Sequence, residues 1–132
     1  MATIPATHAD LLKEKKALAA LATLNADGSP QVTPVWVDFD GGNVLVNTAK
    51  GRVKTKNLER EPRVALTVVD PENPYRHVGI QGRVTEITES GADAHIDKLS
   101  KKYLDKDTYP FRVAGEVRVI VKIAPDKVYT MG

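Results

Sequence analysis

Alternation of apolar and polar residues indicates that much of this chain is β-strand. In residues 116–123 the alternation places Val117, Val119, Val121 and Ile123 toward a core and Glu116, Arg118 and Lys122 toward solvent. Further strands are expected at 17–25, 31–39, 44–48, 64–69, 77–87 and 127–130. Glycine-containing turns at 26–29 and 40–42 separate the first three of these strands, which indicates an antiparallel meander.

Three segments have helical character. His8–Lys16 is expected to form a helix that Thr7 caps, and Lys50–Arg60 one that ends before Pro62. Ser90 is expected to cap a third helix, of roughly 13 residues, whose apolar face comprises Ala92, Ile96, Leu99 and Tyr103.

Six or seven short strands with so few helices predict a mainly β fold. The natural arrangement is a closed or half-closed antiparallel barrel with two or three peripheral helices. At 132 residues the chain has room for one domain, 1–132. Only 5% of the residues are aromatic, so the core must consist mainly of Val, Leu, Ile and Ala.

Several kinds of chemistry are missing from the sequence. There is no cysteine, no glycine-rich nucleotide loop and no nucleophile elbow. His8, His77 and His95 stand in different elements, which argues against a metal site, and His8 and His95 are expected to be solvated helix residues. A protein of this composition can still be an enzyme if a cofactor supplies the reactivity.

The apolar segments are short. The longest mostly apolar run, 17–24, is far below the roughly 20 residues that span a membrane. Residues 1–16 carry charges throughout and lack the apolar centre of a signal peptide. We therefore expect a soluble, cytoplasmic protein without a membrane partner.

Positive charge is concentrated in one segment. The chain carries a net charge of +2, whereas residues 50–63 hold six Lys and Arg against two Glu. Such a concentration suits a discrete anionic ligand better than a long polyanion, and the segment lacks the interleaved aromatic residues of a nucleic-acid site. A solvated basic face would have the same composition, so both interpretations stay open here.

The same segment leaves a strand and enters a helix. Gly51 allows the backbone to turn, and Arg52 and Lys54 fall in the first helical turn, where free N–H groups favour an anion. A guanidinium fork beside an ammonium group suits a phosphate monoester or diester.

Four short motifs follow one another along the chain. They are 21–24 with 27–30, 31–36 (Gln-Val-Thr-Pro-Val-Trp), 50–52 with 54–58 and 62–64, and 79–84. With these motifs the sequence resembles the pyridoxamine 5′-phosphate oxidase-like split barrels, and within them the actinobacterial deazaflavin-dependent reductases. The likeness extends over about residues 8–130 and implies a split β-barrel that forms a homodimer with shared cofactor sites.

The resemblance also implies where a cofactor would lie. Arg52 and Lys54 would hold its phosphate, 31–36 would run along its ring, 46–50 would form the opposite wall, and 75–77 would reach across to the partner subunit. The implied cofactor-binding residues are Gln31, Thr33, Pro34, Val35, Trp36, Thr48, Lys50, Gly51, Arg52, Lys54, Lys56, Asn57, Tyr75 and His77. No residue stands out as catalytic, although Tyr75 and His77 are candidate proton donors.

Three functional hypotheses follow. The first is an oxidoreductase that transfers a hydride from reduced coenzyme F420 to an activated C=C or C=N bond of a small organic acceptor. The second keeps the fold and uses FMN, and the third is a carrier that binds a flavin or haem without turnover. Structural roles also stay open: Trp36 as ordinary core, Tyr75 and His77 on the surface of a loop, and Arg83 as a solvated or ion-paired strand residue.

Overall fold

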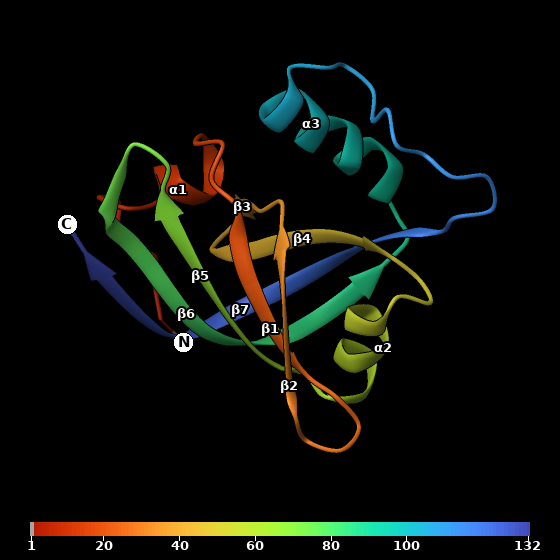
Figure 1. Ribbon diagram of the computed structural model, residues 1–132, viewed down its shortest axis with the longest axis horizontal. Coiled ribbons are helices and arrows are strands. Elements are labelled where there is room, and N and C mark those ends of the chain that lie inside the picture. The colour runs from red at the N-terminus through yellow and green to blue at the C-terminus, as the bar shows by residue number, and fades with distance from the viewer. Residues whose placement is uncertain (1) are drawn as a thin grey trace.

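Seven antiparallel strands form one continuous sheet in the computed structural model, which describes residues 2–132. The order across the sheet is β2-β1-β5-β6-β7-β4-β3 (Figure 1). The mainly β fold expected from the alternation is confirmed. The strands are β1 (Ala19–Leu24), β2 (Pro30–Val35), β3 (Asp38–Asp40), β4 (Asn43–Ala49), β5 (Arg63–Asp70), β6 (Asn73–Thr88) and β7 (Arg118–Met131).

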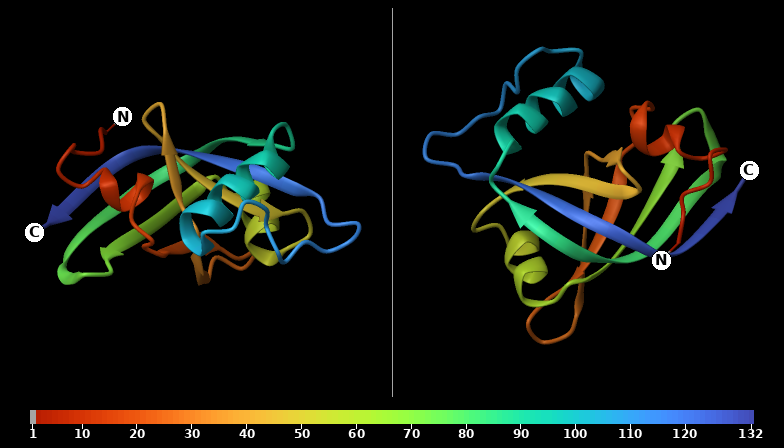
Figure 2. Two further views of the ribbon diagram at one scale, coloured as in Figure 1. Left: turned by 90° about the horizontal axis from the view of Figure 1, so that it is seen from above. Right: turned by 180° about the vertical axis from the view of Figure 1, so that it is seen from behind.

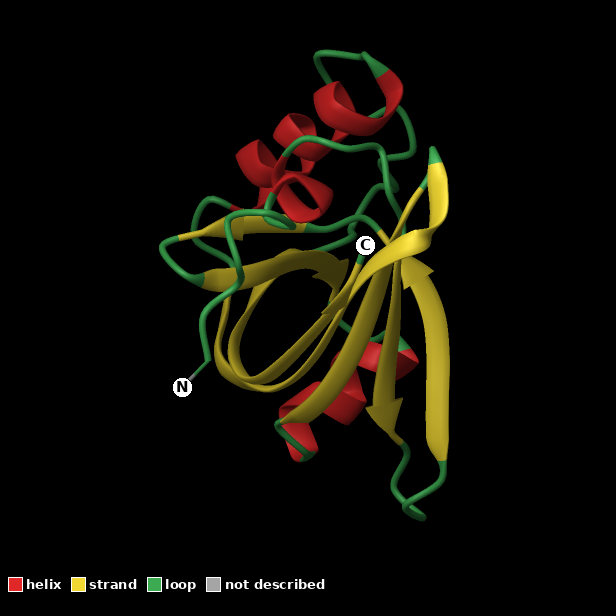
Figure 3. Ribbon diagram, turned by 90° about the vertical axis from the view of Figure 1, so that its left-hand side faces the viewer, coloured by secondary structure: helices red, strands yellow, loops and turns green. Residues whose placement is uncertain are grey.

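The sheet curls into a barrel that stays open between its two edge strands (Figure 3). These edges, β2 and β3, are consecutive in the chain but do not pair with each other. Residues 36 and 37 turn the chain between them, so the single strand expected at 31–39 is two strands. The fold is therefore a split barrel.

Three helices lie outside the strands (Figures 1 and 2): α1 (Asp10–Lys13), α2 (Val53–Arg60) and α3 (Ala92–Leu104). Helix α3 is joined to the link between β2 and β3 and to the segment that precedes β1. The Tyr103 hydroxyl accepts a hydrogen bond from the backbone N–H of Val37 at 3.1 Å and donates one to the carbonyl oxygen of Ala17 at 2.7 Å. Lys102 donates to the carbonyl oxygens of Leu12 and Val37. No helix of residues 2–132 has both the length and the apolar character that crossing a membrane requires.

Two of the expected helix caps are wrong. Helix α1 is shorter than 8–16, and the Thr7 hydroxyl bonds to Nδ1 of His8 instead of capping it. Helix α3 starts after Gly91, whose φ of 75° lies in the left-handed region, and the exposed Ser90 side chain does not cap it. The apolar face of α3 is as expected, with Ala92, Ile96 and Leu99 buried.

Strand β7 is one long strand, although Pro125 suggested two. Pro125 lies opposite Gly82 of β6, and the register shifts there so that Asp126 is an extra residue. A proline is tolerated at such a bulge because it need not donate a ladder hydrogen bond. Strand β6 begins at Asn73, earlier than expected, and Arg83 on it forms an ion pair with Asp126.

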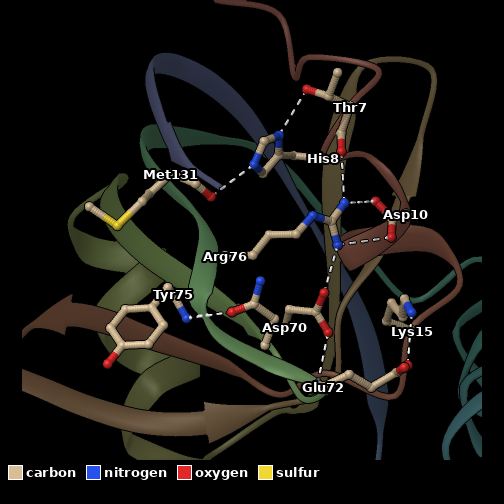
Figure 4. Close-up of polar contacts among 10 residues, drawn as sticks. Thr7, His8, Asp10, Lys15, Asp70, Glu72, Tyr75, Arg76 and Met131 are labelled. Atoms are coloured by element: carbon tan, nitrogen blue, oxygen red, sulfur yellow. Dashed lines mark hydrogen bonds and ion pairs between the residues drawn. The ribbon is translucent and has the colours of Figure 1, made fainter.

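Both helix-region histidines are buried, so the expectation that they are solvated is wrong. His8 is 3% exposed and its Nε2 donates to the carbonyl oxygen of Met131 at 3.0 Å, which connects the two ends of the chain (Figure 4). His95 is 8% exposed and lies between α3 and β3, where it contacts Asp38. Burial of a histidine is acceptable where its ring nitrogens are hydrogen-bonded.

Candidate functional site

A cavity of about 240 Å³ opens where the ends of β2 and β4, the beginnings of α2 and β7, and helix α3 come together. One half of it is apolar, formed by Leu18, Pro34, Val35, Trp36, Ile96 and Tyr109. The other half is polar and cationic, formed by Asn47, Thr48, Arg52, Lys54 and Arg118. Such a cavity suits a flat, largely apolar ligand that carries an anionic group.

Aromatic rings build the apolar wall. Trp36 stacks on Tyr103 with a centroid separation of 5.2 Å and an interplanar angle of 4°, and the edge of Tyr109 meets Trp36 at 5.8 Å. Phe111 packs against Tyr109 in turn at 5.6 Å. These contacts fix the orientation of the Trp36 ring at the point where β2 leaves the sheet.

The cationic half has more positive than negative charge. Glu116 is the carboxylate nearest to it, and it accepts from Arg52 at 3.2 Å and from Arg118 at 2.9 Å. Within residues 2–132, no carboxylate lies within ion-pair distance of Lys54. Burial, together with the charges of Arg52 and Arg118, lowers the pKa of Lys54 below its ordinary value.

Local backbone structure places these cations. Gly51 has φ of 90° and turns the chain out of β4, and Arg52 is the extended residue immediately before α2. The Thr55 hydroxyl donates to the carbonyl oxygen of Ala49 at 2.7 Å and holds the start of α2 against the end of β4. Free N–H groups of the first helical turn add to the positive potential that the side chains create.

A buried polar chain lies behind the cavity. Nε2 of His95 donates to Asp38 at 3.1 Å, and the Asn47 side-chain amide donates to Nδ1 of His95 at 3.2 Å. Burial alone would raise the pKa of Asp38, but hydrogen bonds from His95, the Phe39 N–H and Lys98 hold it well below its ordinary value. Asp38 is therefore a buried carboxylate that stays ionised.

The expected cofactor residues are only partly brought together. Six line the cavity: Pro34, Val35, Trp36, Thr48, Arg52 and Lys54. Gln31, Thr33, Lys50, Gly51, Lys56 and Asn57 lie nearby in the chain but outside its lining. Lys50 forms an ion pair with Glu89 at 2.6 Å, and the buried Asn57 donates to Thr23 and Asn25, which joins α2 to β1.

Tyr75 (Figure 4) and His77 lie at the start of β6. Neither lines the cavity of their own chain. Tyr75 is 77% exposed, and His77 is half-buried opposite Val69 and Met131. The expectation that they serve the site of a partner subunit, and that either donates a proton, stays a prediction.

Four lining residues were absent from the expected set, Leu18, Ile96, Tyr109 and Arg118, and Asn47 was included only in the wall expected at 46–50. Arg118 had been assigned to the solvent side by strict alternation, which is wrong, because its side chain is 5% exposed. Tyr109 comes from a loop that Asp97 of α3 contacts twice: it accepts from the Tyr109 N–H at 2.8 Å and from Arg112 at 2.6 Å. Helical spacing marks Ile96 only as part of the apolar face of α3, and no local pattern in the sequence marks Leu18, Tyr109 or Arg118 as site residues.

A second, larger hollow of about 430 Å³ lies among β1, β5, β6 and β7. Ala22, Ala65, Gln81 and Lys127 are among the residues that line it, and none of the expected cofactor residues does. In residues 2–132 no group of three or more His, Asp or Glu side chains is placed to hold a metal ion.

A family model and a curated protein, both described as pyridoxamine 5′-phosphate oxidases, match this chain. The family model described as pyridoxamine 5′-phosphate oxidase matches residues 4–132. A pyridoxine/pyridoxamine 5′-phosphate oxidase from Bradyrhizobium sp. (strain ORS 278) is 32% identical over 84 residues, which are 63% of this chain and 38% of that protein. This chain therefore spans well under half the length of that curated relative.

Solved structures resemble the whole chain. One named F420 reductase superposes with a TM-score of 0.84 at 32% identity, covering 96% of this chain and 98% of the other. HutZ, the heme storage protein from Vibrio cholerae, superposes with a TM-score of 0.67 at 14% identity, covering 93% and 91% of the two chains. The second likeness is one of fold alone.

Proposed function

Because this chain belongs to the pyridoxamine 5′-phosphate oxidase family, we propose that it is an oxidoreductase that uses coenzyme F420. In the proposed reaction a hydride passes from the reduced deazaflavin to an activated C=C or C=N bond of a small organic acceptor. The resemblance on which the sequence analysis relied is confirmed, and the family and its F420 reductase neighbour support a flavin or deazaflavin cofactor.

One observation carries the proposal: within residues 2–132 no carboxylate pairs with Lys54, whose charged neighbours are Arg52 and Arg118. Three cations face one carboxylate, Glu116, so the cavity has a charge excess that an anionic ligand would neutralise. An aromatic wall lies directly beside these cations, and this pairing fits a ring system joined to a phosphate.

The reduced deazaflavin supplies the hydride when it is bound. Arg52 and Lys54 are proposed to bind its phosphate oxygens by charge-assisted hydrogen bonds. Pro34, Val35 and Trp36 would flank the ring, and Tyr109 would cover it from the side, so that bulk water is kept from the reacting carbon. The chain contributes orientation and a partly dry cavity, and solvent supplies the proton.

F420 is preferred over FMN for two reasons. The F420 reductase structure matches almost the full length of both chains. The deazaflavin continues beyond its phosphate into an anionic tail, and the exposed Lys56 lies two residues from Lys54, whereas the charge of Lys50 is already paired with Glu89. FMN, which ends in a phosphate monoester, is the competing outcome of the test below.

The protein is also proposed to act as a homodimer. Large apolar side chains are exposed on its strands, among them Val32 (66%), Tyr129 (49%) and Met131 (55%), and the 430 Å³ hollow lies on the same sheet. Burial of such surface in a second copy would be favourable. Sedimentation at micromolar concentration should show a dimer, and a monomer there would contradict this part of the proposal.

The deciding experiment is a fluorescence titration of the purified protein with F420 and, in parallel, with FMN. The wild type should bind F420 more tightly than FMN, and added salt should weaken the binding. Lys54→Met and Arg52→Ala should each weaken F420 binding by about tenfold or more, because a charge-assisted hydrogen bond contributes roughly 1.5–3 kcal/mol.

Lys13→Met is the matched control, since Lys13 is an exposed cation on α1 that does not line the cavity. A preference for FMN would replace F420 with the second cofactor. Binding of neither, or equal affinity in wild type and Lys54→Met, would end the proposal. If F420 binds, its oxidation with candidate acceptors distinguishes an enzyme from a carrier.

A further inference from the structure

Arg118 is the most enclosed cation of the molecule's cavity. Its side chain is 5% exposed, Nε donates to Oδ1 of Asn47 at 2.9 Å, and Nη1 donates to Glu116 at 2.9 Å. Its guanidinium carbon lies 5.3 Å from the centre of the Tyr109 ring. The third nitrogen, Nη2, has no hydrogen-bond partner within residues 2–132.

Nη2 must face open space. In the described part of the chain, no side-chain nitrogen or oxygen is both sealed from solvent and without a partner. Since Arg118 lines the cavity and is otherwise buried, its free nitrogen faces the cavity. A guanidinium N–H group held there offers a directed hydrogen bond to an anionic oxygen.

We propose that Arg118 is a third anion-binding residue of the cavity, contacting the same phosphoryl group that Arg52 and Lys54 hold. The inference rests on the proposed function only for the identity of the whole ligand; the anion site itself follows from the geometry. Arg118 approaches from β7, whereas Arg52 approaches from the position just before α2 and Lys54 from the first turn of α2. A phosphoryl group between the two elements would be bound from both sides, which fixes its position better than one helix terminus could.

Asn47 acts on this residue as a positioning group. Its Oδ1 accepts from Arg118, while its amide donates to the Ala92 carbonyl oxygen at 2.9 Å and to His95 at 3.2 Å. Asp38 holds His95 in turn at 3.1 Å. The guanidinium is therefore attached through Asn47 to the beginning of α3 and to a buried carboxylate, and Glu116 restrains its other side. The Arg118 side chain would therefore lose little conformational entropy when the anion binds.

The test uses two probes on the full chain: inorganic pyrophosphate, followed by the rise in melting temperature, and F420 or FMN, followed by fluorescence. Arg118→Met should raise the dissociation constants about 10- to 100-fold, and Arg118→Lys, which keeps the charge but loses the fork, should raise them less. Lys122→Met is the control, because Lys122 lies on the same strand, pairs with Glu86 at 2.9 Å and does not line the cavity.

The two probes separate this inference from the proposed function. If neither cofactor binds the wild type but pyrophosphate stabilises it and fails to stabilise Arg118→Met, the anion site stands and the cofactor proposal falls. If F420 binds the wild type and both Arg118 variants with equal affinity, the cofactor proposal stands and the proposed role of Arg118 in anion binding is overturned. If the wild-type protein binds neither pyrophosphate nor F420 nor FMN, both the anion site and the cofactor proposal are overturned. Should Arg118→Met not fold, Arg118→Lys alone decides, and unchanged affinity in it overturns the inference.

A mutant cycle tests the role of Asn47. Asn47→Leu should weaken binding of both probes. In the double variant with Arg118→Met, binding should be weaker than in Arg118→Met alone by less than about twofold, because the two substitutions disrupt the same contact between Arg118 and the anion. Fully additive losses would show that Asn47 acts independently of Arg118 and would overturn the positioning role.

Discussion

Nε2 of His95 donates a hydrogen bond to Oδ2 of Asp38 across 3.1 Å, and both side chains are more than nine-tenths buried. Asn47 donates to the other ring nitrogen, which requires that the neutral ring carry its proton on Nε2. Asp38 and Asn47 together thus fix one tautomer of His95. The contact between His95 and Asp38, 57 positions apart, joins helix α3 to the edge strand β3. The His95–Asp38 pair stabilises the packing of α3 on the barrel, and through Asn47 it also contacts the lining of the cavity.

The Asp38 carboxylate should make stability depend on pH in the acid range. Its pKa is held below the ordinary 3.8 in the folded protein, so its contribution is fully present above that value and is lost as the pH falls below it. Asp38→Asn should lower the free energy of unfolding by roughly 1–3 kcal/mol at neutral pH and flatten the acid limb of the profile. Urea unfolding at a series of pH values measures both effects.

Asp107→Asn is the control for that experiment, since its carboxyl group is 91% exposed and 3.6 Å from Lys101. An acid limb unchanged by Asp38→Asn would show that the buried pair is not its source.

Tyr103→Phe should destabilise the protein by about 1–3 kcal/mol. The change keeps the ring that stacks on Trp36 but removes the hydroxyl that joins Val37, in the link between β2 and β3, to Ala17, which precedes β1. Tyr129→Phe, on an exposed ring, should change stability little. Thermal unfolding compares the two variants, and an equal change in melting temperature would mean that the Tyr103 hydroxyl does not stabilise the fold.

Two glycines of β6 should respond differently to alanine. A Cβ at Gly82 would lie 2.5 Å from the Ala124 carbonyl oxygen, a backbone atom at the bulge that cannot move alone. A Cβ at Gly79 would meet only the ring of Tyr129, which is half exposed and can rotate away. Gly82→Ala should therefore lower the melting temperature clearly more than Gly79→Ala, and the reverse order would contradict the rigidity of the bulge.

Arg76 should hold the amino-terminal segment against the sheet (Figure 4). Its guanidinium binds Asp10 at 2.5 Å, Asp70 at 2.9 Å and the Thr7 carbonyl oxygen at 2.7 Å, and it is mostly buried. Arg76→Gln leaves the two carboxylates without their counter-charge, so we expect loss of about 1–3 kcal/mol and faster hydrogen exchange in residues 4–14.

The hydrogen-exchange readout distinguishes local release from general loss of stability. Arg83→Gln, which removes an exposed ion pair to Asp126, is the matched control. If the backbone amides of residues 4–14 exchange at the same rate in Arg76→Gln and Arg83→Gln, Arg76 does not hold this segment against the sheet.

The sequence by itself determined where most strand residues lie, the Gly41–Gly42 turn and the apolar face of α3, because these depend on repeats of two or 3.6 residues and on backbone freedom at glycine. It did not determine the break at residues 36 and 37 or the continuity of β7. It also placed Arg52 and Lys54 at a helix start, where both line the cavity. These features depend on neighbours in the chain.

Only the tertiary structure decided which polar residues turn inward. Alternation assigns Arg118 to solvent and its residue type assigns His95 to solvent, yet both are buried. Asn47 and Asp38, from strands far away in the sequence, satisfy their hydrogen bonds, and the neighbouring Glu116 adds an ion pair to Arg118. The same holds for Tyr109, whose loop is held over the cavity by Arg112. Burial of a polar group depends on partners far away in sequence, and a local pattern carries no record of them.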